Sequence, residues 1–345
     1  APLGVPFYSY LPQILGISVA RLLNLGNLPL LFLGRIFGLA FFIICVFFAI
    51  KVIPVGQRTL FTIALLPGSL WSGSSFSYDL IVNSVAFLII GYSFFLIFEK
   101  EKVKFKDVLF LGFLILIVSS CKVVYVLLAL LCVLIPVEKF SSKGKFYLSN
   151  VGIWAVGILS LAVSRISTIA SMAMAEETYN NGSEGFTIMD VFNEPFHALR
   201  LGYNSIRKIT DDILRPVFGG KLGFWDIDIP YYLVFGFCIL VFLSTLLLIE
   251  EKVRINAKEK VVFVLVSCSV IAACMLAMLL DFTPSSSQLI LGVQGRYFIP
   301  VLPLAALVFQ SGNIRARNNL VSSCIIGIYA MNFLVLWRVF ETILE

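Results

Sequence analysis

A carboxylate between two apolar stretches is the residue of this sequence best placed to do chemistry. Asp79 ends the tripeptide Ser77-Tyr78-Asp79, and apolar runs lie on both sides of the loop that contains it. A carboxylate at such a place can take a proton from a hydroxyl group or orient the molecule that carries it. Asn83 follows one helical turn later on the same face and could orient Asp79. Ser77 or Asp79 could instead simply cap the helix that begins here.

Three basic residues are candidates for binding an anion such as a phosphate. Lys122 interrupts an apolar stretch, and Arg35 lies about 9 Å inside another. Arg296 follows two glycines and stands beside Gln294 and Tyr297, and its planar guanidinium suits a phosphate or pyrophosphate. A charge at the centre of a membrane helix costs about 2.5–3.5 kcal/mol, so such positions indicate function. The alternatives are that Arg35 extends its charge to the membrane surface and that Arg296 is an interface anchor.

The composition identifies the class of protein that must position these residues. Of the 345 residues, 59% are hydrophobic and only 13% are charged, and the mean hydropathy is +0.98. A soluble domain has about 45–50% apolar and about 25% charged residues, so the sequence indicates a polytopic membrane protein. The net charge of +6 comes from short loops between apolar runs, without the aromatic-interleaved basic patch of a nucleic-acid-binding protein. We therefore predict membrane lipid as a partner and no nucleic acid.

The apolar runs predict an all-α fold. A membrane-crossing helix needs about 20 residues, and about eight full spans are expected. They are placed at 29–50, 59–71, 80–98, 148–170, 230–249, 261–281, 297–310 and 320–340. The runs 108–120 and 123–137 are too short to cross and are flanked by lysine-rich loops, which predicts a short interrupted helical hairpin over 108–137. We treat 1–345 as a single membrane domain.

The distribution of Lys and Arg predicts the orientation in the membrane. More than half of the 26 basic residues lie in five short loops, which the positive-inside rule makes cytoplasmic. These loops are 51–58, 99–107, 138–147, 250–260 and 311–319. The other connections, 1–28, 67–79, 171–229 and 282–296, then face outward together with the C-terminus. The candidate site is accordingly predicted on the outer face of a multi-pass plasma (inner) membrane protein.

Two outer segments are expected to contain helices of their own. The apolar residues of Tyr10–Leu25 fall mostly on one face, so residues 1–28 are predicted to hold an interfacial helix. The loop 171–229 is too small for an independent domain, and apolar residues at helical intervals over Phe186–Leu214 predict a helical cap. Asp190 could cap a turn there.

These residues together favour chemistry on a lipid-linked phosphate. Such a reaction needs an apolar groove for a prenyl tail, cations for the phosphate that leaves, and a carboxylate for the acceptor hydroxyl. Arg296, Lys122 and Arg35 supply cations and Asp79 the carboxylate. No metal or other cofactor is predicted, because His197 is the only histidine and has no partner at metal-ligand spacing.

Five segments resemble the ordered landmarks of one family. It is a family of bacterial polytopic membrane proteins known as domain of unknown function 2142. The landmarks are Tyr10-Leu-Pro-Gln13, Leu65-Leu-Pro-Gly-Ser69 followed by Ser77-Tyr-Asp79, Cys121-Lys-Val-Val-Tyr125, Phe218-Gly-Gly-Lys-Leu-Gly-Phe-Trp-Asp226, and Gly292-Val-Gln-Gly-Arg-Tyr-Phe-Ile-Pro300. The organisation of this family is similar to that of GT-C glycosyltransferases. The resemblance implies transfer of a sugar, without a metal, from a polyprenyl-phosphate donor to a glycan or lipid-linked acceptor of the cell envelope.

The resemblance leaves the position of the catalytic base open. GT-C enzymes usually carry an acidic residue in the first outer loop, whereas residues 1–28 contain neither Asp nor Glu. We expect that this segment is the remainder of a truncated first outer loop, with the main base upstream of Ala1, or that Asp79 serves as the base. Otherwise the protein is not a transferase. The alternatives are then a transporter or flippase for lipid-linked glycans, or a ligase that uses a pyrophosphate-linked donor.

Overall fold

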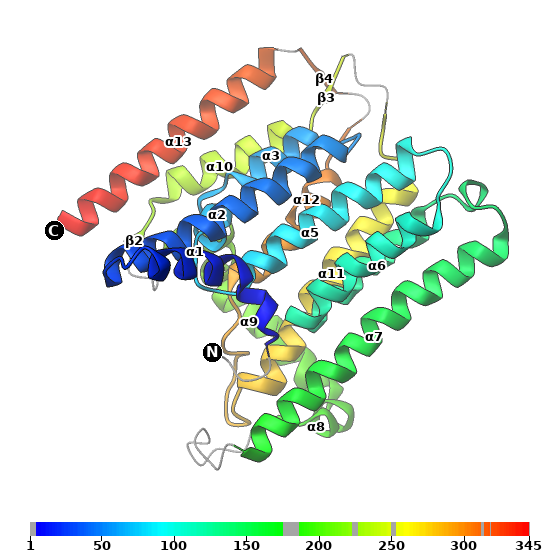
Figure 1. Ribbon diagram of the computed structural model, residues 1–345, viewed down its shortest axis with the longest axis horizontal. Coiled ribbons are helices and arrows are strands. Elements are labelled where there is room, and N and C mark those ends of the chain that lie inside the picture. The colour runs from blue at the N-terminus through cyan, green and yellow to red at the C-terminus, as the bar shows by residue number, and fades with distance from the viewer. Residues whose placement is uncertain are drawn as a thin grey trace.

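The protein is a bundle of long helices with shorter helices at one end. The computed structural model describes residues 5–174, 186–222, 227–249, 253–311, 314–317 and 319–344. The longer helices lie side by side and run along one common direction, diagonal in the view of Figure 1. This arrangement agrees with a membrane protein, because every backbone group inside a bilayer must find its partner within the chain.

The elements follow one another along the chain with short connections. The first half contains η1 (Phe7–Tyr10), α1 (Leu11–Leu22), α2 (Asn27–Val52), α3 (Gln57–Ala64), α4 (Pro67–Gly73), α5 (Asp79–Phe94), the π-helical turn η2 (Phe95–Glu99), α6 (Phe105–Cys121), the 3₁₀ helices η3 (Val123–Leu134) and η4 (Val137–Lys139), and α7 (Lys143–Met174). The second half contains α8 (Ile188–Asn193), α9 (Pro195–Val217), α10 (Tyr231–Ser244), α11 (Ala257–Phe282), the 3₁₀ helix η5 (Gly295–Val301), α12 (Leu302–Leu307) and α13 (Asn319–Leu344).

Strands contribute only two small pairs. The antiparallel pair joins β1 (Lys221–Leu222) to β2 (Ile227–Asp228), and the parallel pair joins β3 (Leu247–Leu248) to β4 (Arg315–Ala316). The prediction of a helical membrane fold is therefore confirmed at the level of class.

Among the described residues, four helices are long and apolar enough to cross a membrane. They are α2, α5 continued by η2, α11 and α13. Their burial differs widely: 83% of the most apolar part of α5–η2 is buried, against 11% for α13. Hence α5 is the central helix of the bundle, while α13 lies at its edge, as Figure 1 shows. The count of about eight full spans stays a prediction.

The predicted span 59–71 is wrong as a single helix. The structure divides it into α3 and α4, with Leu65 and Leu66 between them. Leu66 is extended, with φ −61° and ψ 142°, because the ring of Pro67 disfavours helical geometry in the preceding residue. The break tilts α4 away and directs its C-terminal end toward the loop that precedes Asp79.

Two other predicted spans are shorter or less regular than expected. The span 230–249 ends as a helix at Ser244, and the chain then forms β3 beside β4. The span 297–310 consists of η5 and α12, which contain Pro300 and Pro303 and end at Leu307. Proline removes a backbone donor, so continuous α-helical hydrogen bonding is lost across this segment.

The described part of the loop 171–229 is helical. Thr187 caps α8, and its hydroxyl accepts a hydrogen bond from the backbone N–H of Asp190 at 3.2 Å. Asp190 thus lies in the first turn and bonds back to Thr187, rather than being the cap itself. Leu201 of α9 packs in a small cluster with Met275, Leu279 and Ile290. Residues 175–185 and 223–226 of the loop lie outside the described residues.

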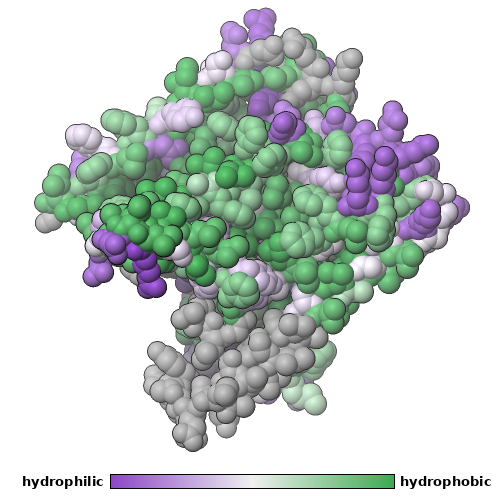
Figure 2. Space-filling model, in the orientation of Figure 1, coloured by the Kyte–Doolittle hydropathy of each residue, from purple (hydrophilic) through white to green (hydrophobic). Residues whose placement is uncertain are grey.

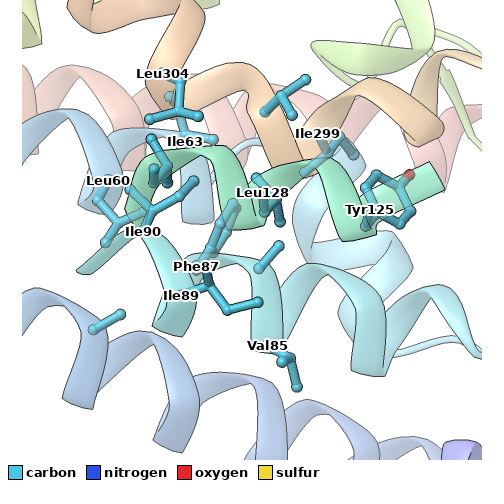
Figure 3. Close-up of a cluster of buried hydrophobic side chains, with 14 of the residues drawn as sticks. Leu60, Ile63, Val85, Phe87, Ile89, Ile90, Tyr125, Leu128, Ile299 and Leu304 are labelled. Atoms are coloured by element: carbon cyan, nitrogen blue, oxygen red, sulfur yellow. The ribbon is translucent and has the colours of Figure 1, made fainter. Parts of the chain in front are cut away.

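The main hydrophobic core surrounds α5. Side chains of α3, α5, η3, η5 and α12 meet there, as Figure 3 shows for Leu60, Phe87, Leu128, Ile299 and Leu304. All five are fully buried. This core holds the N-terminal end of α5 against η3 and η5, the two elements that follow Lys122 and contain Arg296.

Candidate functional site

Two basic side chains from distant parts of the sequence meet the Asp79 carboxylate. Lys122 Nζ lies 3.6 Å from Oδ1 of Asp79, and Arg296 Nε lies 3.2 Å from Oδ2. Asp79 begins α5, Lys122 separates α6 from η3, and Arg296 is in the first turn of η5. Three of the predicted site residues are therefore brought together at one end of the bundle.

Asp79 is held at this position by the loop before it. Its backbone N–H donates a hydrogen bond to Ser77 Oγ at 3.1 Å, so Ser77 supports the first turn of α5. Asp79 itself is only 4% exposed. A buried carboxylate needs compensating positive charge, and its two oxygens face Lys122 and Arg296.

Lys122 is held in place more by an aromatic ring than by hydrogen bonds. Its Nζ lies 3.2 Å from the centre of the Tyr297 ring and 5.8 Å from that of Tyr78, in cation–π geometry. Among the described residues this buried ammonium has no hydrogen-bond partner, because Asp79 is too distant for one. Lys122 thus retains hydrogen-bond donors for a ligand or for water.

Arg296 links the buried carboxylate to the surface. Its Nε belongs to the ion pair with Asp79 but is not aligned for a hydrogen bond with any described residue. The side chain is 40% exposed, which lets the outer part of the guanidinium reach a ligand. Its Cζ lies 5.8 Å from the centre of the Tyr297 ring.

Tyrosines surround these charges. The Tyr125 hydroxyl donates a hydrogen bond to the Tyr297 backbone carbonyl at 2.7 Å and fixes the ring on which Lys122 rests. Burial raises the pKa of the Tyr78 phenol, and the negative charge of Asp79 raises it further. Burial and Asp79 act in the same direction on the pKa of Tyr10. Both phenols are consequently neutral at pH 7 and can donate hydrogen bonds.

Gln13 is a residue of this region to which the sequence analysis assigned no role beyond its place in a landmark. Its Nε2 donates to the backbone carbonyls of Ser75 and Ser77, at 3.2 Å and 3.4 Å. Its Oε1 is buried and has no described hydrogen-bond partner. The available signal was a polar side chain within an apolar helical stretch, and Gln13 does lie on the buried side of α1.

Two predicted site residues have other partners. Asn83 donates to Ser72 Oγ at 2.8 Å, so it joins α5 to α4 instead of orienting Asp79. Arg35 donates from Nε to the Ser74 carbonyl at 3.0 Å, and its Cζ lies 5.3 Å from the centre of the Trp71 ring. Arg35 thus braces the loop before Asp79, and its role in phosphate binding stays a prediction.

The chain that carries Arg296 makes a tight turn just before it. Gly292 has φ +77°, a conformation that favours glycine, and a Cβ atom there would lie 2.6 Å from the Phe282 ring. The Gln294 carbonyl then accepts the backbone N–H of Tyr297 at 3.0 Å and begins η5. Gln294 therefore acts here through its backbone.

The region offers anion-binding groups rather than metal ligands. Within the described part of the chain, no three His, Cys, Asp or Glu side chains are grouped as metal ligands would be. His197 is exposed and lies 3.5 Å from Glu194. The two cations exceed the single carboxylate by one positive charge, which attracts an anion into a partly dry environment.

Comparison with known proteins agrees with this description at the level of family. The model of the family described as "Predicted membrane protein (DUF2142)" matches residues 5–305. The chain belongs to this family. The match includes Asp79, Lys122 and Arg296 and all the elements that position them. No curated protein and no solved structure matches the chain.

Proposed function

We infer that the protein is a membrane glycosyltransferase that moves a sugar from a polyprenyl-phosphate donor to a glycan or lipid-linked acceptor. The observation that carries this proposal is the buried Lys122 ammonium, which has no described hydrogen-bond partner and lies next to a partly exposed arginine. A phosphate placed there would satisfy both cations. Its prenyl tail would extend along the apolar faces of the bundle.

The transfer breaks the bond between the anomeric carbon and the phosphate oxygen. A new bond forms from the acceptor hydroxyl oxygen to that carbon, and the hydroxyl proton passes to a base. Lys122 and Arg296 stabilise the negative charge that develops on the leaving phosphate. Asp79 holds both cations in place through its two oxygens, and its second role is to orient the acceptor hydroxyl or receive its proton.

The site is proposed to face the outer side of a bacterial plasma membrane. Asp79 and the lysine-rich loop 99–107 lie at opposite ends of the α5–η2 helix, about 30 Å apart at 1.5 Å per residue. The positive-inside rule assigns the lysine-rich end to the cytoplasm. The same rule applies to the competing transporter, so orientation alone does not separate the two functions.

Binding of polyprenyl phosphate, the product common to all such donors, tests the phosphate site. The wild-type protein in detergent micelles should bind polyprenyl monophosphate, and Arg296→Gln should weaken it by about 30-fold or more, as expected for removing one partner of a charged contact. Arg35→Gln is the matched control, because Arg35 contacts Ser74 instead of Asp79. Equal affinities of wild type and Arg296→Gln would remove Arg296 from the phosphate site.

Turnover distinguishes a transferase from a transporter. Proteoliposomes that contain the protein, a labelled polyprenyl-phosphate sugar and envelope glycans should release polyprenyl phosphate as labelled glycan forms. Intact donor that changes leaflet without being consumed would show a flippase instead. A donor consumed only as the pyrophosphate-linked form would show a ligase.

A further inference from the structure

A groove between α6 and α7 lies away from the Asp79 site. It has a volume of about 1040 Å³, at the upper end of the about 300–1,000 Å³ typical of ligand pockets. Both helices begin at its polar end, α6 at Phe105 and α7 at Lys143. In Figure 2, hydrophilic residues gather over this end of the two helices, next to a broad hydrophobic surface.

Charge and polarity change along the length of the groove. Lys102, Lys104 and Lys145 line its polar end, together with the hydroxyl-bearing Ser141 and Ser149. Its remaining lining is almost entirely aliphatic or aromatic, and none of the described lining residues is acidic. Asp107, the carboxylate nearest in sequence, accepts instead from the Lys100 side chain and the Lys104 backbone. The groove therefore has a cationic entrance and an apolar interior.

Two glycines create the space between the helices. Gly112 of α6 and Gly152 of α7 both line the groove, and a Cβ atom built on either would meet no other atom within 4 Å. Gly157, farther along α7, is different, because its Cβ would lie 2.3 Å from Val126. Close helix packing thus explains Gly157, whereas Gly112 and Gly152 border open space.

The depth of the groove corresponds to one leaflet of a bilayer. Leu116, its deepest residue on α6, is about 16 Å from the start of that helix at 1.5 Å per residue. Half of the hydrocarbon core is about 15 Å thick. Phe113 and Leu109, which also line the groove, are exposed on the outside of the bundle, as lipid-facing residues are.

We propose that this groove binds one anionic diacyl phospholipid, with its phosphate at Lys102, Lys104 and Lys145 and an acyl chain between α6 and α7 over Gly112 and Gly152. The lysines match a negatively charged headgroup, the serine hydroxyls match its polar ester region, and the apolar part matches the length of one leaflet. Basic pockets between membrane helices on the cytoplasmic side are known to hold anionic headgroups. This site is independent of the proposed transfer reaction.

Native mass spectrometry of the full chain tests the proposal with phosphatidylglycerol and phosphatidylcholine of identical acyl chains. The wild-type protein should retain one phosphatidylglycerol and bind phosphatidylcholine far more weakly. The triple variant Lys102→Ala/Lys104→Ala/Lys145→Ala should bind phosphatidylglycerol roughly 100-fold more weakly, because each lysine near an anionic surface contributes substantially. Equal retention of the two lipids by the wild type would overturn the proposal.

Two further variants separate a built site from general charge attraction. The control Lys106→Ala/Lys143→Ala/Lys258→Ala removes the same charge from exposed lysines that do not line the groove, and its phosphatidylglycerol binding should stay within about threefold. Gly112→Leu/Gly152→Leu keeps every lysine but fills the apolar part, and should lose the bound lipid while remaining folded. A control that loses as much lipid as the groove variant, or a filled groove that retains it, would contradict the proposal.

A final comparison identifies the occupant. Polyprenyl monophosphate added to the phosphatidylglycerol complex should not displace the bound lipid, since the proposed occupant has two chains of one-leaflet length. Displacement from the wild type at equal concentration would show that the groove belongs to the prenyl lipid and would overturn the assignment. Lys122→Met, at the opposite end of α6, should leave phosphatidylglycerol binding unchanged.

Discussion

The two ends of the central helices each hold a buried carboxylate beside a lysine, but only one of them is fully hydrogen-bonded. Asp107 accepts from Lys100 at 2.6 Å, from Tyr92 at 2.8 Å and from the Lys104 backbone at 2.7 Å. Asp79 faces two cations, and neither makes an aligned hydrogen bond with it. A saturated cluster stabilises the fold, whereas an unsaturated one retains donors for a ligand.

Exposure also separates the two clusters. The Lys100 and Asp107 side chains are 20% and 3% exposed, and the pair closes the capped first turn of α6. In the Asp79 cluster the carboxylate is equally buried, but Arg296 is 40% exposed and opens toward the surroundings. The difference indicates that similar residue types serve stability at one end of the bundle and binding at the other.

The largest expected effect is loss of transfer when Lys122 becomes methionine. Lys122→Met keeps the length and apolar part of the side chain but removes the charge that faces the leaving phosphate. Transfer should fall about 100- to 1,000-fold, as for removal of one transition-state donor. The measurement is the initial rate of sugar transfer in proteoliposomes, normalised to folded protein.

Lys100→Met is the matched control for that variant, because Lys100 belongs to the saturated cluster. It should lower the unfolding temperature and leave transfer per folded molecule unchanged. If the two methionine variants lost transfer equally, the functional distinction between the clusters would be wrong.

The next effect is destabilisation by Asp107→Ala. Removing this carboxylate leaves Lys100 and Tyr92 without their acceptor, and breaking a buried pair costs about 3 kcal/mol. Thermal unfolding in detergent should show a clearly lower midpoint. Glu101→Ala, in the same loop but exposed, should leave the midpoint almost unchanged, and a matching loss there would contradict the role of Asp107.

A smaller effect is expected for Asn83→Ala. The variant loses the hydrogen bond to Ser72 between α5 and α4, which contributes about 1 kcal/mol. Stability should fall slightly, while the affinity for polyprenyl monophosphate should not change. A weakened affinity without loss of stability would restore Asn83 as a residue that orients Asp79.

The smallest effect concerns acid stability. Asp107 lies before the apolar run of α6; burial raises its pKa, but hydrogen bonds from Lys100, Lys104 and Tyr92 outweigh burial and hold the pKa below its ordinary value of 3.8. A carboxyl whose pKa is lowered by folding stabilises the protein above its unfolded pKa, and this contribution is lost as pH falls. The wild-type unfolding midpoint should therefore decrease below about pH 4.

Asp107→Asn checks the source of that decrease. The asparagine cannot titrate, so the difference in midpoint between the wild type and this variant should shrink as pH falls below about 4. A difference that stays constant over that range would show that Asp107 is not responsible.

Sequence reasoning was most successful where composition alone decides. The helices α2, α5, α11 and α13 were predicted because long apolar runs are stable only as helices in a membrane. It was less successful where proline interrupts such a run, since 59–71 is divided at Leu66. Asp107 received no role, because a carboxylate at the edge of a lysine-rich loop resembles any solvated charge.

The sequence by itself determined the membrane class, the family landmarks and the short set of charged residues in apolar surroundings. Only the tertiary structure decided which of those residues are neighbours: Lys122 and Arg296 meet Asp79, while Arg35 and Asn83 contact the loop and helix beside it. The physical reason is that apolar periodicity depends on each segment alone. The pairing of distant charges instead depends on how η3 and η5 pack against the first turn of α5.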